Sequence, residues 1–174
     1  AYFKKRHYKV VTFNMYDIYN DEDIHYKDWI ERAEQKLKET LELNQPVIIL
    51  GFSMGGVIAS YLASIYPVQS LILVAPAFQY LDLPKATAHG VKFVKEIGHK
   101  DKDDISSQRT KAFTKIVSKY KESIAAVDCP VLILHGLNDE VIPLDSSRNA
   151  YEKITGKKFM MFIADGKHRM LYDN

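Results

Sequence analysis

Three side chains in this sequence have the types and the chain order that nucleophilic catalysis needs: Ser53, Asp139 and His168. A serine hydroxyl is a weak nucleophile, and it becomes reactive when an imidazole accepts its proton and a carboxylate holds that imidazole in one tautomer. Ser53 lies in GFSMG, residues 51–55, which matches the G-x-S-x-G pattern of a nucleophile on a sharp turn. The pattern alone arises by chance in roughly one of twenty chains of this length, so the neighbouring elements must support it.

Ser53 is expected to stand between a strand and a helix. Residues 47–50, VIIL, form the short apolar, β-branched run that is typical of a strand buried on both faces of a parallel sheet. Apolar residues then recur at helical spacing from Val57 to Ile65, which places Ser53 at a helix N-terminus, where negative charge is favoured. We expect Gly51 and Gly55 to occupy positions where a side chain would collide with the neighbouring strand and helix.

The two partners of Ser53 each follow a predicted strand of their own. Asp139 comes shortly after the apolar run 131–134, and His168 follows the run 158–163. Asp145 and Asp165 are alternative acids. Asp139 is preferred because a loop that directly follows a buried strand can face the carboxyl edge of the sheet.

The stretches GFSMGG (51–56), LILHGLNDEVIP (132–143) and DGKH (165–168) resemble the three signatures of the α/β-hydrolases, in the carboxylesterase, monoacylglycerol lipase and serine aminopeptidase-like group. The resemblance covers nearly the whole chain. It implies an α/β-hydrolase fold: a mostly parallel sheet flanked by helices, with a helical cap inserted after the strand that follows the nucleophile helix. It also implies that Ser53 is the nucleophile, Asp139 the orienting acid, His168 the general base and the backbone N–H of Met54 one oxyanion-hole donor. The family's second donor, on a loop that often reads His-Gly, has no match here.

The first forty residues bear on this missing donor. Residues 8–13, YKVVTF, predict a strand, and the spacing of Trp29, Ala33 and Leu37 predicts a helix over about 26–43. In the resembling family, this strand and helix lead directly into the nucleophile strand, so we expect the chain to begin partway into the fold, without its first three strands, and to lack the last helix. The alternative is a compact hydrolase whose first strand is 8–13 and whose oxyanion loop is 14–16.

Beyond the predicted strand at 70–76, residues 77–126 contain no strand-like run and two helical patterns, at 86–97 and 105–124. We therefore predict a core formed by residues 1–76 and 127–174, with residues 77–126 as its cap. The candidate substrate-binding residues are Phe52 and the cap residues Phe78, Tyr80 and Phe93, with Phe113 on the second cap helix. Most of an apolar stripe is core, but together these residues favour an apolar acyl or aromatic group in the substrate.

Composition limits the partners. The formal net charge of +2 argues against nucleic acid, and no run of about 18 apolar residues predicts a membrane span. The single cysteine, Cys129, excludes an internal disulfide, and with no visible signal peptide it favours the cytoplasm. No metal-binding spacing, phosphate loop or dinucleotide fingerprint is present, so we expect no metal and no cofactor. His135 is expected to be structural, and the oligomeric state stays open.

These observations predict a serine hydrolase that cleaves small-molecule carboxylic esters of small to medium apolar acyl groups through an acyl-enzyme on Ser53. Amide or peptide hydrolysis, acyl transfer and a non-catalytic binding role remain open, because the pocket rather than the triad selects the substrate.

Overall fold

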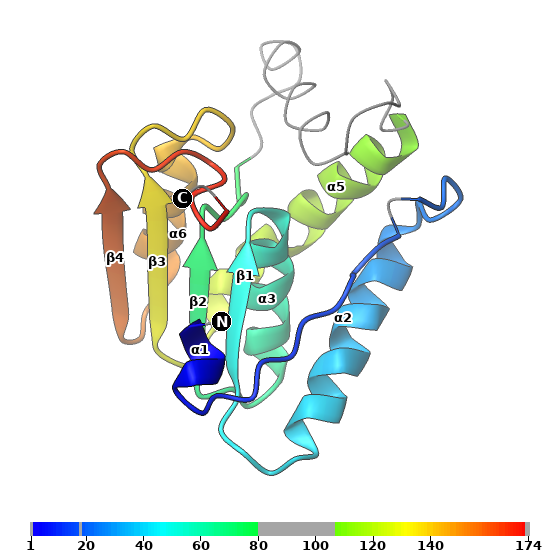
Figure 1. The fold of residues 1–174 in the computed structure, drawn as a ribbon. Helices are drawn as coiled ribbons and strands as arrows, with labels where there is room; N and C mark the ends of the chain where they lie inside the picture. The colour runs from blue at the N-terminus through cyan, green and yellow to red at the C-terminus, as the bar shows by residue number, and fades with distance from the viewer. Residues whose placement is uncertain (1, 18, 80–106, 173–174) are drawn as a thin grey trace.

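The computed structural model describes residues 2–17, 19–79 and 107–172 (Figure 1). Their elements are, in chain order, α1 (Tyr2–Lys5), α2 (Tyr26–Leu41), β1 (Ile48–Phe52), α3 (Met54–Ile65), β2 (Ser70–Val74), α5 (Ser107–Tyr120), the 3₁₀ helix η1 (Lys121–Ala126), β3 (Val131–Gly136), α6 (Leu144–Lys153) and β4 (Lys158–Ile163).

The strands form one parallel sheet in the order β1-β2-β3-β4. Because all four strands run the same way, their carboxyl ends meet at one edge of the sheet (Figure 1). Ser53 follows β1 at this edge, and the loops that carry Asp139 and His168 follow β3 and β4. The predicted parallel sheet is thus confirmed.

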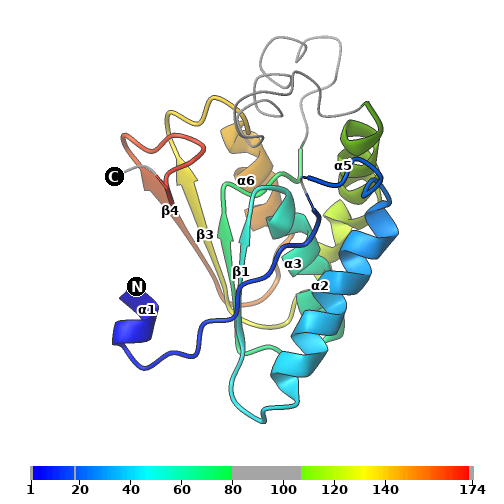
Figure 2. The ribbon, with the colours of Figure 1, turned by 45° about the vertical axis from the view of Figure 1, so that its right-hand side comes forward.

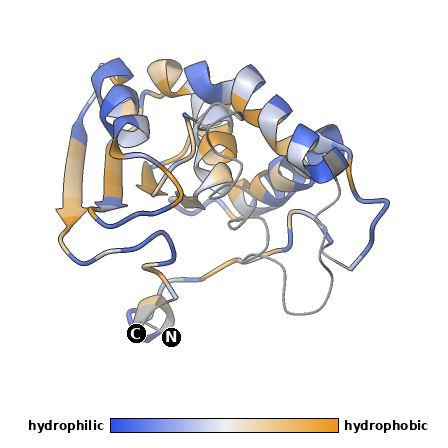
Figure 3. Ribbon diagram, turned by 90° about the horizontal axis from the view of Figure 1, so that it is seen from above, coloured by the Kyte–Doolittle hydropathy of each residue, from blue (hydrophilic) through white to orange (hydrophobic). Residues whose placement is uncertain are grey.

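The longer helices cover one face of this sheet (Figure 3). α3 packs against β1 and β2 and α6 against β3, while α2 and α5 pack on α3 (Figure 2). The strand side chains under these helices are fully buried, among them Leu71, Leu73, Val131 and Ile133. On the opposite face apolar side chains of the two outer strands are exposed: Ile48, Leu50, Phe159 and Met161.

The described part of the predicted cap comprises residues 77–79, α5 and η1, and α5 packs into the core. The Phe113 ring lies 5.4 Å from the fully buried Trp29 of α2, and Tyr16 stacks on the same indole at 4.9 Å. Phe113 is therefore a core residue. The other predicted cap helix, 86–97, lies outside the described residues, so the division into core and cap stays a prediction.

The predicted strand at residues 8–13 is wrong. The segment has no regular secondary structure and pairs with none of the four strands of the described sheet. Tyr8, Val10, Val11 and Phe13 are all exposed. An apolar, β-branched sequence becomes a strand only where a neighbouring strand accepts its backbone hydrogen bonds. The alternative of a compact hydrolase, in which residues 8–13 are the first strand, consequently loses that strand.

Asp23 fixes the segment that precedes α2. Its carboxylate accepts hydrogen bonds from Trp29 Nε1 at 2.8 Å, from Arg32 Nη1 at 2.7 Å and from the Asp17 amide at 2.7 Å. Burial by itself raises the pKa of the Asp23 carboxyl, but these hydrogen bonds outweigh burial and lower it below its usual value. Ionised Asp23 is thus more stable in the folded chain than in the unfolded one.

Replacing Asp23 with Asn tests this contribution. Because the pKa of Asp23 is lower in the folded state, its stabilisation is present above the unfolded value of about 4 and is lost as the pH falls toward the folded value. We expect Asp23→Asn to lower the free energy of unfolding at pH 7 by about 1–3 kcal/mol, and by less at pH 3. Urea denaturation followed by Trp29 fluorescence measures both values. The exposed Asp21 provides a control, Asp21→Asn, and an equal loss at both pH values would contradict the assignment.

Candidate active site

Ser53 has a strained backbone conformation. Its φ of 53° and ψ of −123° lie in a region that non-glycine residues rarely adopt. Three backbone hydrogen bonds hold it there. The Ser53 amide donates to the Val74 carbonyl at 3.0 Å, and the Ser53 carbonyl accepts from the amides of Gly56 at 2.9 Å and Ala77 at 3.1 Å. The side chain is buried, and among the described residues its hydroxyl has no hydrogen-bond partner. The strained conformation agrees with the sharp turn that the G-x-S-x-G pattern predicts.

The glycines of the turn differ in their roles. A Cβ at Gly51 would lie 2.6 Å from the Gly55 carbonyl oxygen and 2.7 Å from Ala59 Cβ, so only glycine fits there. At Gly55 the expectation is wrong, because a Cβ there would meet nothing within 4 Å. The crowded helical position is instead Gly56, where a Cβ would lie 2.9 Å from Pro76 Cβ. The close contacts at Gly51 and Gly56 bring α3 against β1 and the end of β2.

Asp139 and His168 form a buried pair. His168 Nδ1 donates to Asp139 Oδ2 at 2.9 Å, and each side chain is 1% exposed. The other carboxylate oxygen, Oδ1, accepts from the amides of Val141 and Ile142 at 2.9 and 2.8 Å. Because Nδ1 carries the hydrogen, Nε2 of the neutral ring has the lone pair that a general base uses.

The surroundings of Asp139 keep it negatively charged. Burial raises its pKa, but hydrogen bonds from His135, His168 and the Ile142 amide outweigh burial and hold the pKa well below its usual range. At neutral pH the carboxylate can therefore act only as an acceptor, and an imidazolium at His168 would be stabilised by it.

Phe52 links the Ser53 turn to His168. Its ring centroid lies 4.9 Å from that of the imidazole and 6.0 Å from that of Tyr172. Phe52 directly precedes Ser53, so the turn and the Asp139–His168 pair are neighbours at the carboxyl edge of the sheet. Four of the predicted residues thus lie at this edge: Phe52 ends β1, Ser53 is on the turn that follows, and Asp139 and His168 are on the loops after β3 and β4.

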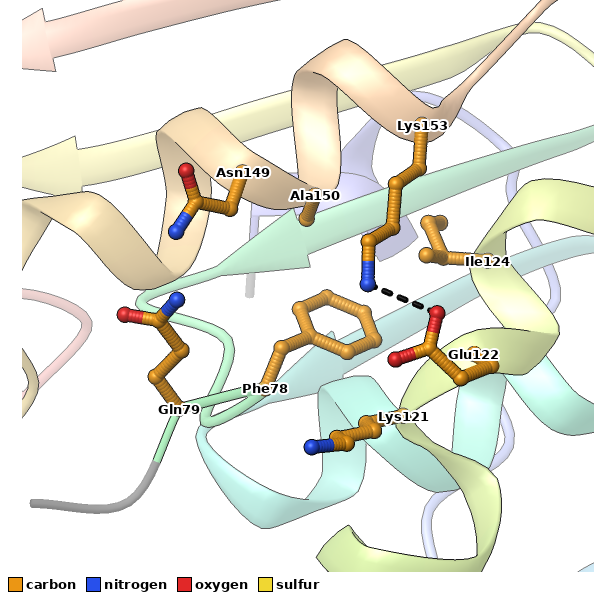
Figure 4. A pocket seen from close by; sticks show the side chains of 8 residues that line it. All are labelled: Phe78, Gln79, Lys121, Glu122, Ile124, Asn149, Ala150 and Lys153. Carbon is orange, nitrogen blue, oxygen red and sulfur yellow. Dashed lines mark hydrogen bonds and ion pairs between the residues drawn. The ribbon is translucent and has the colours of Figure 1, made fainter. Parts of the chain in front are cut away.

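Phe78, another candidate substrate contact, lies elsewhere. It is buried and lines a pocket between α6 and η1, together with Ile124, Asn149 and the ion pair of Lys153 with Glu122 at 2.7 Å (Figure 4). Ser53, Asp139 and His168 are not among the residues that line this pocket. A substrate contact by Phe78 stays a prediction, and Tyr80 and Phe93 lie outside the described residues.

Of the two expected oxyanion donors, one has a candidate among the described residues and the other has none. Met54 is the first residue of α3, so its amide belongs to the first turn of that helix, where backbone N–H groups are available. Residues 14–16, the alternative oxyanion loop, are tied to α2: the Met15 carbonyl accepts from Arg32, and Tyr16 stacks on Trp29. The second donor stays unidentified.

Two glycines bring the loops of Asp139 and His168 together. A Cβ at Gly136 would lie 2.1 Å from the Gly166 carbonyl oxygen, and a Cβ at Gly166 would lie 2.8 Å from Gly136 Cα. The backbones are joined by hydrogen bonds from Leu137 to Ile163 and from Asn138 to Gly166, both at 2.9 Å. This contact fixes the separation of the two loops, and sequence analysis did not anticipate it.

We expect Gly136→Ala to force the two loops apart. Because the added methyl group would overlap backbone, the variant should lose about 1–3 kcal/mol of unfolding free energy and the downfield proton resonance of the His168–Asp139 hydrogen bond. Gly156→Ala is the matched control, because a Cβ there would lie 3.7 Å from its nearest neighbour, the Asp128 carbonyl oxygen. Urea denaturation and proton NMR measure the two effects. An unchanged resonance in Gly136→Ala would contradict the proposed constraint.

Within the described ranges, no three metal-ligating side chains lie close enough to hold an ion. None of the described helices combines the length and the apolar character that crossing a bilayer requires.

Comparison with known proteins gives a match to one family model. Residues 17–100, which include Ser53, match the family model described as serine aminopeptidase, S33. No curated protein matches the chain in sequence.

Solved structures extend the similarity to most of the chain. A structure from LipS and LipT, two metagenome-derived lipolytic enzymes, has a TM-score of 0.67 at 19% identity, over 89% of this chain and 71% of that one. A monoacylglycerol lipase from Paleococcus ferrophilus has a TM-score of 0.63 at 19% identity, over 83% and 68%. An esterase from Exiguobacterium antarcticum has a TM-score of 0.59 at 16% identity, over 88% and 70%. Together with the parallel sheet and the turn at Ser53, these similarities show that the chain has an α/β-hydrolase fold.

Proposed function

We propose that this chain is a serine hydrolase that cleaves carboxylic esters of small to medium apolar acyl groups. The observation that carries the proposal is the buried hydrogen bond from His168 Nδ1 to Asp139 Oδ2, with the strained Ser53 turn packed beside the same imidazole through Phe52. The pair leaves His168 Nε2 as the basic nitrogen, and the turn supplies a buried hydroxyl.

The proposed reaction uses these groups in two stages. Ser53 Oγ attacks the ester carbonyl while His168 Nε2 takes the hydroxyl proton, and Asp139 stabilises the resulting imidazolium. The Met54 amide, at the N-terminus of α3, binds the oxyanion. The tetrahedral intermediate collapses, and the alcohol leaves with the proton from His168. Water then attacks the acyl-enzyme with His168 again as base, which releases the acid and restores Ser53.

The surroundings of the site favour an apolar acyl group. Phe52 is half-buried against His168, and the exposed Tyr172 ring lies next to it. Aromatic side chains beside a reacting centre bind apolar parts of a substrate. The similar structures include a monoacylglycerol lipase and an esterase, which is consistent with an ester substrate.

Ser53→Ala tests the nucleophile. With a p-nitrophenyl ester series from acetate to decanoate, we expect the variant to lose on the order of 10⁴- to 10⁶-fold in kcat, because without Oγ no acyl-enzyme can form. The control is Ser60→Ala: Ser60 is also a buried serine, and its hydroxyl donates to the Gly56 carbonyl within α3. Equal turnover by Ser53→Ala and the parent would overturn the proposal. A parent that neither turns over esters nor reacts with a fluorophosphonate probe would favour a binding role.

Asp139→Asn tests the orienting acid. An amide at this position can donate to His168 Nδ1 and so favour the wrong tautomer, and we expect a loss of about 10⁴-fold in kcat. Probe labelling of Ser53 should slow in parallel, because labelling also needs the base. Wild-type kcat in Asp139→Asn would remove Asp139 from the mechanism.

Peptide hydrolysis is the second candidate, because the matching family model describes a serine aminopeptidase. The two activities share Ser53 and His168 and differ in the leaving group. Comparing the p-nitrophenyl ester and the p-nitroanilide of one amino acid, with a free and a blocked amino group, separates them. Faster turnover of the free-amine anilide than of the blocked one would favour the aminopeptidase.

A further inference from the structure

Asp139 contacts a second imidazole besides that of His168. His135, near the end of β3, is fully buried, and its Nε2 lies 3.3 Å from Asp139 Oδ2. This is the same oxygen that accepts the hydrogen bond from His168 Nδ1. One carboxylate oxygen is thus placed between two imidazole rings.

The neighbours of His135 determine where its hydrogen lies. Nε2 also lies 3.1 Å from the Ile142 carbonyl oxygen, and neither this carbonyl nor a carboxylate can donate. Nε2 must therefore carry a hydrogen, which it donates to the Ile142 carbonyl, and Asp139 Oδ2 lies 3.3 Å from the same nitrogen. The other ring nitrogen, Nδ1, lies 2.6 Å from Ser147 Oγ, whose hydroxyl can donate or accept.

These contacts join three elements around the acid. The His135 backbone belongs to β3, Ser147 belongs to α6, and Ile142 lies in the loop that carries Asp139. His135 thus connects β3 and α6 to Asp139 and Ile142 in the loop between them. Oδ1 is already held by the Val141 and Ile142 amides, so the position of Oδ2 sets the plane of the carboxylate.

We propose that His135 is a positioning residue of the reaction. By donating from Nε2 to Asp139 Oδ2 and to the Ile142 carbonyl, it keeps the carboxylate in the plane that meets His168 Nδ1. This role rests on the proposed serine hydrolase function. It goes beyond the structural role that sequence analysis gave to His135, because a histidine that only fills the core needs no contact with the catalytic acid.

Two amide substitutions separate positioning from packing. In His135→Gln, the side-chain nitrogen is as many bonds from Cβ as imidazole Nε2 is, so it can still donate to Asp139. In His135→Asn, the amide nitrogen replaces Nδ1 and faces Ser147, and donation to Asp139 is lost. Both variants keep a neutral polar side chain at a buried site, so they are closely matched.

We expect His135→Asn to lower kcat per active site by between about 10-fold and 10²-fold, the upper value being the cost of a misplacement of about 1 Å. KM should stay nearly constant, because His135 does not face the substrate. His135→Gln should keep kcat within about threefold of the parent. Active sites are counted with a fluorophosphonate probe, which removes any contribution from unfolded protein. Ile154→Val, a core substitution away from Asp139, is the control for lowered stability.

A second readout does not depend on turnover. In protein labelled with ¹⁵N at histidine, NMR should show a hydrogen on His135 Nε2 in the parent. The downfield resonance of the His168 Nδ1 hydrogen should persist in His135→Gln and be lost or strongly shifted in His135→Asn.

The outcomes are distinct. Equal kcat values for His135→Asn and His135→Gln, or an unprotonated Nε2 in the parent, would overturn the positioning role. If neither variant folds, the Nε2 result in the parent decides. If the parent has no hydrolase activity but the resonance changes as expected, the proposed function fails while the coupling of His135 to the Asp139–His168 pair holds.

Discussion

The carboxylate of Asp139 is the group on which the whole candidate site depends. It is buried, and a buried charge is stable only when its acceptor positions are filled. Two backbone amides bind one of its oxygens, and two imidazoles lie at the other. This arrangement keeps Asp139 negatively charged, so the carboxylate would stabilise an imidazolium at His168. It also fixes the orientation of the His168 ring.

Backbone packing sets the distances between the functional groups of the site. Gly136 and Gly166 are in close contact, so the loops after β3 and β4 leave the sheet as one unit. Ser53 is positioned separately, by the contacts of Gly51 and Gly56 with α3 and Pro76. The Phe52 ring joins the two parts across the sheet edge. Each functional side chain thus lies next to a position where backbone or glycine contacts allow little movement.

The helices of the described fold support the carboxyl edge of the sheet from the covered face. The helices on the covered face bury the inner side chains of β2 and β3, and α2 and α5 enclose Trp29. α5 was predicted as part of a cap, yet Phe113 is in the core. Helical periodicity identifies an apolar face but not the element that the face contacts, so a cap helix and a core helix have the same pattern.

The sequence by itself determined the residue types, their order and most of the local elements. The strands that precede Ser53, Asp139 and His168 were predictable because a short apolar run is a local signal, and α2 was predictable because its apolar spacing is local too. The strained turn at Ser53 followed from a five-residue pattern. Tertiary structure decided the rest: residues 8–13 form no strand, Gly55 faces open space while Gly56 is crowded, and His135 reaches Asp139. A strand needs a neighbouring strand and Gly56 meets Pro76, so these outcomes depend on segments distant in the chain. His135 and Asp139 are only four residues apart, and the path of the loop after β3, which its packing against other segments sets, brings their side chains together.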